Sequence, residues 1–146
     1  MRALTISQPH AQLIAEGFKD VENRTWSTRW RGPLLIHAGL QCDVLAQIPA
    51  ELDEERAEAA RAAVQRGYDR RGMIVGVVQL VDVNEAGNHL SPWTMPEHKQ
   101  WVLADPIAFD EPVLAPGRQG LWMPTERELQ QVDRVLTRMK LSGGAR

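Results

Sequence analysis

Residues 17–32, GFKDVENRTWSTRWRG, concentrate side chains that could bind or process a flat anion. Four basic residues, two acids and two of the chain's five tryptophans fall within this stretch. The forked donors of arginine match phosphate oxygens, and a tryptophan ring stacks on a nucleobase with a free energy of about 1–3 kcal/mol. The stretch therefore suggests a clamp for an anion with a flat face, formed by Arg24, Arg29 and Arg31 with Trp26 or Trp30.

A regular strand through residues 20–26 would alternate its side chains between two faces. Glu22, Arg24 and Trp26 would share one face, and Val21 would point toward the core on the other. The simpler interpretation is a solvated strand edge on which Glu22 and Arg24 merely pair, an interaction of about 0–1 kcal/mol. For Trp26 alone, packing in the core is the simpler role. A surface pair and an anion clamp both stay open at this level.

Lys19 is out of phase with the charged face of that strand. We expect it in the turn just after Gly17, where the chain must reverse at the end of a helix. His37, in the apolar run GPLLIHA, is expected to be a hydrogen-bonded core histidine rather than a catalyst. Trp101 and Trp122 are expected in the core, although Trp122 could border a groove.

Other chemistry has little support in the sequence. There is no Gly-rich phosphate loop and no GxSxG nucleophile elbow. The histidines lack the HxxxH or HExxH spacing of a zinc site, and the single cysteine has no second cysteine to join it. We therefore expect no metal and no cofactor, and we expect Cys42 to pack as a small hydrophobe. The histidines are His10, His37, His89 and His98.

Length, charge and cysteine content indicate the class of protein. With 146 residues, 43% of them hydrophobic and 25% charged, the chain fits a single globular domain. A net charge of −2 gives no long-range attraction to nucleic acid, so any basic footprint is local. One cysteine permits no disulfide within the chain and favours a reducing cytoplasm, and no apolar run reaches the ~18 residues of a membrane span. We expect a cytoplasmic protein with no membrane partner.

The first helix is expected directly before the charged stretch. Ser7 is its expected N-cap, Pro9 lies in its first turn and Gly17 offers the stop, which makes a helix of about two to three turns. A second helix is expected over roughly residues 50–66, after Pro49. Its expected apolar stripe is Leu52, Ala59, Ala60, Ala63 and Val64.

A C-terminal helix is expected to open with a capping box, in which Thr125 and Glu128 satisfy each other's backbone donors. One side of this helix is apolar and consists of Leu129, Val132, Val135, Leu136 and Met139. The last residues, SGGAR, are expected to be a frayed tail.

About six strands accompany these helices. They are expected at residues 2–7, 21–27, 32–38 and 72–83, as one or two strands within 99–114 that Pro106 and Pro112 break, and as a short last strand within 116–124. GNHLSP, residues 87–92, is expected to be a loop. Because there is no regular βαβ alternation, the pattern predicts the α+β class, with a small curled sheet or barrel.

The stretch SQPHAQLIAEGFKDVENRTWSTRWRGPLLIHA resembles the ASCH domain, a family with a PUA-like β-barrel flanked by helices. The family's GxKxxExR motif is present as Gly17, Lys19, Glu22 and Arg24. A family-like QP opens the first helix, and residues 30–38 match YRGPLLIHA. GVVQLVDV, WVLADPIAF with EPV, and GRQGLW follow in order, so the likeness spans residues 4–123.

The resemblance implies one ASCH/PUA-like domain over residues 1–146, with a core at 2–124 and a C-terminal helix at 125–140. It also implies a groove between the first helix and the barrel. The expected ligand is RNA or another single-stranded nucleic acid, or a nucleotide-like small molecule. The residues expected to bind it are Gln8, His10, Lys19, Glu22, Arg24, Trp26, Arg29 and Arg31.

Two other functions accompany this resemblance. One bacterial branch looks like amidohydrolases of acetylated cytidine, and some relatives are credited with ribonuclease activity. In a hydrolase, Lys19 and Glu22 would take the acid and base roles, although Glu22 stands where that branch has a threonine. Many relatives also carry an aromatic residue at the position of His10. A likeness to a domain of a transcriptional coactivator implies a protein-interaction module as the third alternative.

Overall fold

The computed structural model describes residues 1–87 and 91–144, so His89 and part of the expected loop at 87–92 lie outside the described residues. The elements in chain order are β1 (Arg2–Gln8), α1 (His10–Ala15), β2 (Val21–Arg24), β3 (Gly32–Cys42), α2 (Glu54–Tyr68), β4 (Met73–Asn84), β5 (Lys99–Leu114), β6 (Leu121–Trp122) and α3 (Glu126–Gly144).

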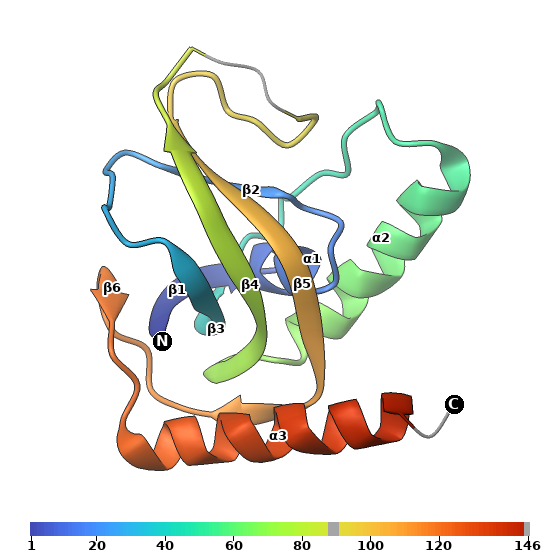
Figure 1. The fold of residues 1–146 in the computed structure, drawn as a ribbon. Coiled ribbons are helices and arrows are strands. Elements are labelled where there is room, and N and C mark those ends of the chain that lie inside the picture. Colours follow the sequence, from blue (N-terminus) through green and yellow to red (C-terminus); the bar gives the residue numbers. More distant parts are fainter. Residues whose placement is uncertain (88–90, 145–146) are drawn as a thin grey trace.

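The six strands form one curled sheet in the order β2-β5-β4-β3-β1-β6 (Figure 1). β1 and β3 run parallel, and the other neighbouring pairs are antiparallel. The sheet makes a half-barrel, with α3 running across one end and α2 lying to one side next to α1 (Figure 1). The expected α+β class, with about six strands and three helices, is confirmed.

Both faces of β3 are buried, which explains why its sequence is a continuous apolar run. Leu34 and Ile36 pack in a core cluster with α1, whose Ile14 is buried against the sheet. Leu35 points to the opposite face and packs in a second cluster with Val132 of α3. The sheet is therefore sandwiched between α1 and α3.

Gly76 in β4 lets α1 approach the sheet closely. A Cβ on this residue would lie 2.5 Å from the carbonyl oxygen of Ile107 and 2.8 Å from the Cβ of Ala15. Only glycine fits such a gap without a shift of the backbone. This contact fixes the position of α1, which carries His10 at its start.

The start of α1 differs from the expectation. Ser7 belongs to β1, and the helix is a short one from His10 to Ala15. The side-chain oxygen of Gln8 accepts a hydrogen bond of 2.9 Å from the backbone N–H of Gln12, which satisfies one of the free donors of the first turn. The expected N-cap at Ser7 and the expected length are wrong, because β1 continues through Gln8.

α2 begins later than expected. Asp53 rather than Pro49 precedes its first turn, and the Asp53 side chain accepts from the N–H of Arg56 at 2.8 Å. The buried residues of the helix are Ala57, Ala60, Ala63 and Gly67. Ala59 is exposed, so the expected stripe is wrong there, because helical spacing from Ala57 leaves Ala59 on the solvent face.

α3 begins with the expected capping box. The N–H of Glu128 donates to Thr125 Oγ1 at 3.1 Å, and the N–H of Thr125 donates to Glu128 Oε1 at 2.8 Å. The five apolar residues expected on one side all pack in the second core cluster. The helix continues to Gly144, beyond its expected end at 140, so most of SGGAR is helical; residues 145–146 lie outside the described part.

β5 is one strand of 16 residues where a broken one was expected. Asp105, just before Pro106, has a φ of 51°, and the pairing of β4 with β5 shifts register at three places. These irregularities accommodate Pro106 and Pro112, which lack the N–H of a regular ladder. The expected breaks are therefore wrong.

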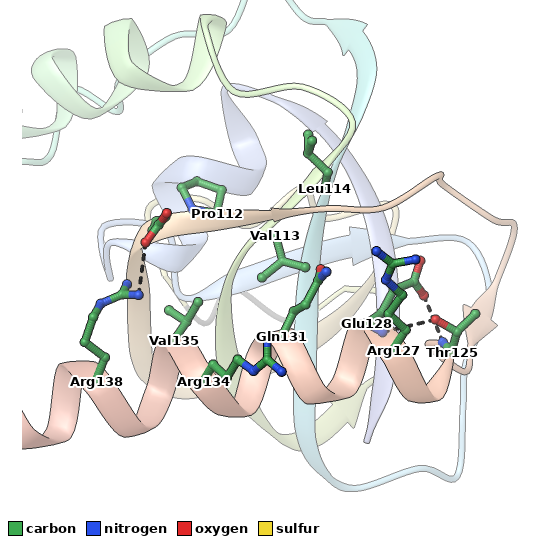
Figure 2. Close-up of a pocket in the computed structure, with 11 residues that line it drawn as sticks. Pro112, Val113, Leu114, Thr125, Arg127, Glu128, Gln131, Arg134, Val135 and Arg138 are labelled. Carbon is green, nitrogen blue, oxygen red and sulfur yellow. Dashed lines mark hydrogen bonds and ion pairs between the residues drawn. The ribbon is translucent and has the colours of Figure 1, made fainter.

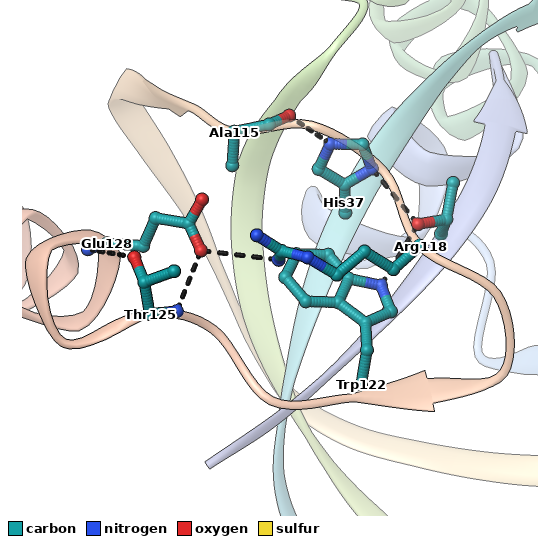
Figure 3. Close-up of polar contacts among 7 residues, drawn as sticks. His37, Ala115, Arg118, Trp122, Thr125 and Glu128 are labelled. Atoms are coloured by element: carbon teal, nitrogen blue, oxygen red, sulfur yellow. Dashed lines mark hydrogen bonds and ion pairs between the residues drawn. The ribbon is translucent and has the colours of Figure 1, made fainter.

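His37 is a buried residue that joins distant parts of the chain (Figure 3). Its Nε2–H donates to the carbonyl oxygen of Ala115 at 2.6 Å, and its Nδ1 accepts from the Thr5 hydroxyl at 3.2 Å. The indole N–H of Trp122 donates to the same hydroxyl oxygen at 3.1 Å. The core role expected for His37 is confirmed, as is the burial of Trp101 and Trp122.

Candidate functional site

A hollow of about 570 Å³ opens where β1 ends, α1 begins and β2 runs past them. We call it the motif hollow, because Lys19, Glu22 and Arg24 of the GxKxxExR motif all line it. His10 and Trp26 line it as well. The structure therefore brings five of the expected binding residues to one solvent-connected cavity.

Only one arginine of the expected three-arginine clamp faces the motif hollow, namely Arg24. Arg31 is exposed and turns back on its own segment, where Nη1 donates to the carbonyl oxygen of Thr28 at 2.8 Å. Its Nη2 lies 3.4 Å from Asp82 Oδ1. Arg29 is exposed and lies outside the lining. A bound ligand in the hollow would meet Arg24 first.

Gln8 and Trp30 serve the fold beside the hollow. Gln8 is fully buried, and its Nε2 donates to the carbonyl oxygen of Arg70 at 2.8 Å. The indole N–H of Trp30 donates to the carbonyl oxygen of Pro33 at 3.3 Å, and the guanidinium of Arg2 lies over its ring at 5.5 Å. Neither residue lines the motif hollow.

Lys19 lies in the connection between α1 and β2, where it was expected. Gly17 has a φ of 84°, a conformation that favours glycine, and it reverses the chain there. Lys19 Nζ lies 3.0 Å from His10 Nδ1. Because only 7% of the residue is exposed, burial lowers the pKa of its ammonium, and the carboxylates of Glu22 and Asp43 oppose this shift.

His10 links Lys19 to a carboxylate. Its Nε2 lies 2.8 Å from Asp43 Oδ2, which accepts, so Nε2 carries the hydrogen and Nδ1 accepts from Lys19. Burial and then the charge of Lys19 lower the pKa of His10, while the hydrogen bond to Asp43 opposes them. The same hydrogen bond lowers the pKa of the Asp43 carboxyl. A neutral imidazole therefore sits between an ammonium and a carboxylate.

Glu22 and Arg24 form an ion pair on the wall of the hollow. Arg24 Nε donates to Glu22 Oε2 at 2.8 Å, and Arg24 Nη2 donates to the carbonyl oxygen of Thr5 at 2.9 Å. Glu22 is 6% exposed, so the pair is largely buried and is not the solvated surface pair of the simpler interpretation. The carboxylate already has a counterion, which it would have to release before acting as an acid or base.

Trp26 supplies an aromatic wall. β2 ends at Arg24, so the expected strand through residue 27 is too long, and Trp26 lies in a bend after it. Its ring packs edge-on against Trp101, with centroids 4.8 Å apart. The exposed apolar side chains of Leu40 and Met95 also line the hollow. Trp26 thus combines partial core packing with a place at the site.

Sequence reasoning missed several residues of this site. Asp43 comes just after β3, at the start of the acid-rich stretch 43–58. That position gave no reason to pair it with His10. Met95 and His98 reach the hollow from the segment before β5. Among the described residues, the buried Nδ1 of His98 has no hydrogen-bond partner. These contacts depend on tertiary structure and have no local motif.

A second hollow, of about 560 Å³, lies between β5 and α3 (Figure 2). Arg127 and Arg134 line it from α3. Arg138 also lines it, and it pairs with Asp110 at 2.6 Å and with Glu111 at 3.0 Å. None of the motif residues lines this second hollow. The arginines that line this second hollow are therefore suitable control positions for substitution, because they are cationic and lie away from the motif residues.

In residues 1–87 and 91–144, no three His, Cys, Asp or Glu side chains are grouped so that they could hold a metal ion. In the same part of the chain, no helix has the length and apolar character needed to cross a membrane. Cys42 is a half-buried free thiol.

Comparison with known proteins identifies the family. A model of the ASCH domain matches residues 4–113, which is more than half of the chain. The crystal structure of ASCH from Zymomonas mobilis is similar, with a TM-score of 0.53 and 12% identity over 92% of this chain and 94% of that one. A mutant of that Zymomonas mobilis protein is similar too, with a TM-score of 0.53 and 13% identity over 91% and 94%.

At such low identity these two structures show the fold alone, and they confirm the expected ASCH/PUA-like architecture of a curled sheet with flanking helices. No curated protein matches the chain. The family match extends from β1 almost to the end of β5 and includes the whole GxKxxExR motif. The chain therefore belongs to the ASCH domain family.

Proposed function

We propose that this protein binds single-stranded RNA and holds one unpaired nucleotide in the motif hollow. The observation that carries the proposal is the convergence of Lys19, Glu22, Arg24 and Trp26 on one open cavity of about 570 Å³. That size lies within the range of small-ligand sites, about 300–1,000 Å³. An isolated nucleotide fits such a cavity, whereas a duplex does not.

The chemistry of the lining suits a nucleobase edge. A base presents both donors and acceptors, and single-stranded RNA is recognised on such edges and by stacking on aromatic rings. Lys19 and Arg24 supply donors, and Glu22 supplies an acceptor. Trp26 supplies the flat surface, and the apolar side chain of Met95 also lines the hollow.

The charge of the hollow favours base recognition over strong phosphate binding. Arg24 is paired with Glu22, and Lys19 is bonded to His10, which is itself bonded to Asp43. The two cations of the lining therefore have two carboxylates close by. Few phosphates are contacted, and we expect a shallow salt dependence, with a slope of about −0.7 for each phosphate on a single strand.

The experiment is a titration of a short labelled RNA, followed by fluorescence anisotropy, with the duplex of the same sequence and nucleoside monophosphates as competitors. We expect the single strand to bind, the monophosphates to compete weakly and the duplex to fail. Lys19→Gln should weaken binding about tenfold, or 1.4 kcal/mol. Arg134→Gln, in the second hollow, is the matched control and should bind as the wild type does.

Three results would overturn the proposal. They are the absence of binding at micromolar RNA, equal affinity for the duplex, and an equal loss in Lys19→Gln and Arg134→Gln. A protein that co-purifies with the chain irrespective of Lys19→Gln and Arg24→Ala would instead favour the protein-interaction alternative.

A further inference from the structure

Lys19 is a buried amine without a counterion of its own. Its Nζ lies 3.0 Å from a neutral ring nitrogen, His10 Nδ1, and this is its one hydrogen bond within residues 1–87 and 91–144. The carboxylate of Glu22 is engaged by Arg24 at 2.8 Å, and that of Asp43 by His10 at 2.8 Å. An ammonium with one acceptor and 7% exposure is poorly compensated.

The surroundings of Lys19 also favour loss of its proton. Burial lowers its pKa, and the nearby guanidinium of Arg24 lowers it further, against the opposing effect of Glu22 and Asp43. Desolvation and an adjacent cation are two of the ways in which proteins activate lysine as a nucleophile. The adjacent cation is Arg24 of β2. The burial occurs in the connection between α1 and β2 that holds Lys19.

His10 is placed to receive that proton. Its Nε2–H is committed to Asp43, so the lone pair of Nδ1 points at Lys19 Nζ. An oriented carboxylate, an imidazole and a nucleophile in this order form the arrangement that activates hydroxyl and thiol nucleophiles elsewhere. The charge of Lys19 disfavours a proton on His10. That effect disappears once Lys19 gives up its proton, and Asp43 stays to stabilise the imidazolium.

We propose that Lys19 is a nucleophilic amine, activated by His10 and Asp43, that forms a reversible imine with an aldehyde-bearing ligand in the motif hollow. The nucleotide size of that ligand rests on the function proposed above; the reactivity of the amine does not. Asp43 is a positioning residue, since it contacts His10 and not Lys19, and its charge also raises the pKa of the Lys19 ammonium.

The reaction balances without a further reactant. A proton moves from the Lys19 ammonium to His10 Nδ1, and the neutral amine attacks the carbonyl carbon, so that a C–N bond replaces the C=O π bond. The carbonyl oxygen leaves as water and takes with it both hydrogens of the neutral amine. The C–O bond breaks as the C=N bond forms. The proton that His10 took from the ammonium returns to the imine nitrogen, so His10 ends neutral.

The test is reductive labelling of the full chain at neutral pH, read by peptide mass spectrometry. Pyridoxal 5′-phosphate with borohydride tests a flat phosphorylated aldehyde, and formaldehyde with cyanoborohydride tests the smallest one. The chain has three lysines, so Lys99, paired with Glu85, and the exposed Lys140 are internal controls. We expect Lys19 to react about tenfold faster than Lys140, despite its burial.

Variants separate activation from mere packing. Asp43→Asn keeps a hydrogen-bond acceptor beside His10 and removes the charge. It should slow the labelling of Lys19, because His10 loses the carboxylate that stabilises its imidazolium. It should also move the pH profile of Lys19 to lower pH, because the charge of Asp43 raises the pKa of the ammonium, with Lys140 unchanged. His10→Gln should slow Lys19 further. If Asp43 did not activate Lys19 through His10, labelling of Lys19 in Asp43→Asn would be at least as fast as in the wild type.

The result that overturns the imine proposal is labelling of Lys19 by both aldehydes no faster than that of Lys140. RNA binding alongside that result would leave the proposed function intact. Fast labelling of Lys19 in a chain that binds no RNA would support the reactive amine and remove the nucleotide from its ligand class. Fast labelling that RNA suppresses at Lys19 alone would support both.

Discussion

Arg24 Nε donates to Glu22 Oε2 over 2.8 Å, which joins two side chains that leave β2 on the same face. The guanidinium continues to the carbonyl oxygen of Thr5 at 2.9 Å, so the pair also connects β2 to β1 across the motif hollow. The side chain of Glu22 is 8% exposed and that of Arg24 26% exposed. The motif therefore stabilises the wall of the site as well as supplying its polar groups.

Arg24→Ala should lower the free energy of unfolding by about 3 kcal/mol, because it leaves the carboxylate of Glu22 buried without a partner. Glu22→Gln should lower the free energy of unfolding by less, since Arg24 is more exposed and keeps its hydrogen bond to the carbonyl oxygen of Thr5. Urea unfolding at neutral pH measures both. Arg29→Ala is the control and should leave the midpoint unchanged. Equal midpoints for Arg24→Ala and Arg29→Ala would mean that Glu22 reaches water by itself.

The stability of the protein should fall as the pH decreases from about 7 to about 5. Burial lowers the pKa of His37 below its ordinary value, so in this range the unfolded chain binds a proton that the folded chain does not. The free energy of unfolding therefore rises with pH across this window. His10 contributes in the same direction, again chiefly because of burial.

Urea unfolding at the two ends of this pH range tests the assignment. His37→Gln should be less stable at neutral pH and should show a shallower pH dependence than the wild type. The pH dependence of stability should also be shallower in His10→Gln, and it should be shallowest in the variant that carries both substitutions. A pH dependence as steep in the double variant as in the wild type would place the titrating groups elsewhere.

Gly76→Ala should destabilise the protein by about 2–3 kcal/mol, because the new methyl group overlaps Ile107 and Ala15 and forces the backbone to move. Val81→Ala, at an exposed position of the same strand, is the control and should change stability by about 0.5 kcal/mol or less. Thermal unfolding followed by circular dichroism distinguishes them. Similar melting temperatures for Gly76→Ala and Val81→Ala would show that α1 can shift without loss of stability.

Thr125→Ala should cost about 1 kcal/mol, because it removes the acceptor that satisfies the N–H of Glu128 at the start of α3. Thr137→Ala, exposed on the same helix, removes no cap and should cost nothing. Denaturant unfolding of the two variants makes the comparison. A loss as large for Thr137→Ala would refute the capping assignment.

Much of the fold follows from local pattern. The long apolar run of β4, the apolar run of β3 and the capping box of α3 were all recognisable from residue types and spacing. The wrong predictions concern where helices and strands begin and end, which tertiary contacts determine. The side chain of Gln8 took the capping role expected of Ser7, and irregular pairing with β4 carried β5 past its two prolines.

The site was predictable where residues lie close in sequence and unpredictable where they do not. Lys19, Glu22 and Arg24 could be grouped by motif and strand parity. Asp43 could not, because its pairing with His10 depends on how β3 ends beside α1. Arg29 and Arg31 looked equivalent to Arg24 by composition, yet the chain leaves the hollow after Trp26, so neither of them lines it.

The pairing of β1 with β6 has a consequence for biosynthesis. Ala3 and Leu4 pair with Trp122 and Leu121, so one edge of the first strand stays open until the ribosome has made nearly the whole domain. A nascent chain arrested before residue 121 would expose that edge to other polypeptides. An mRNA truncated late in its coding region should therefore yield a product that aggregates or binds chaperones. This holds even though all residues of the GxKxxExR motif have already been translated.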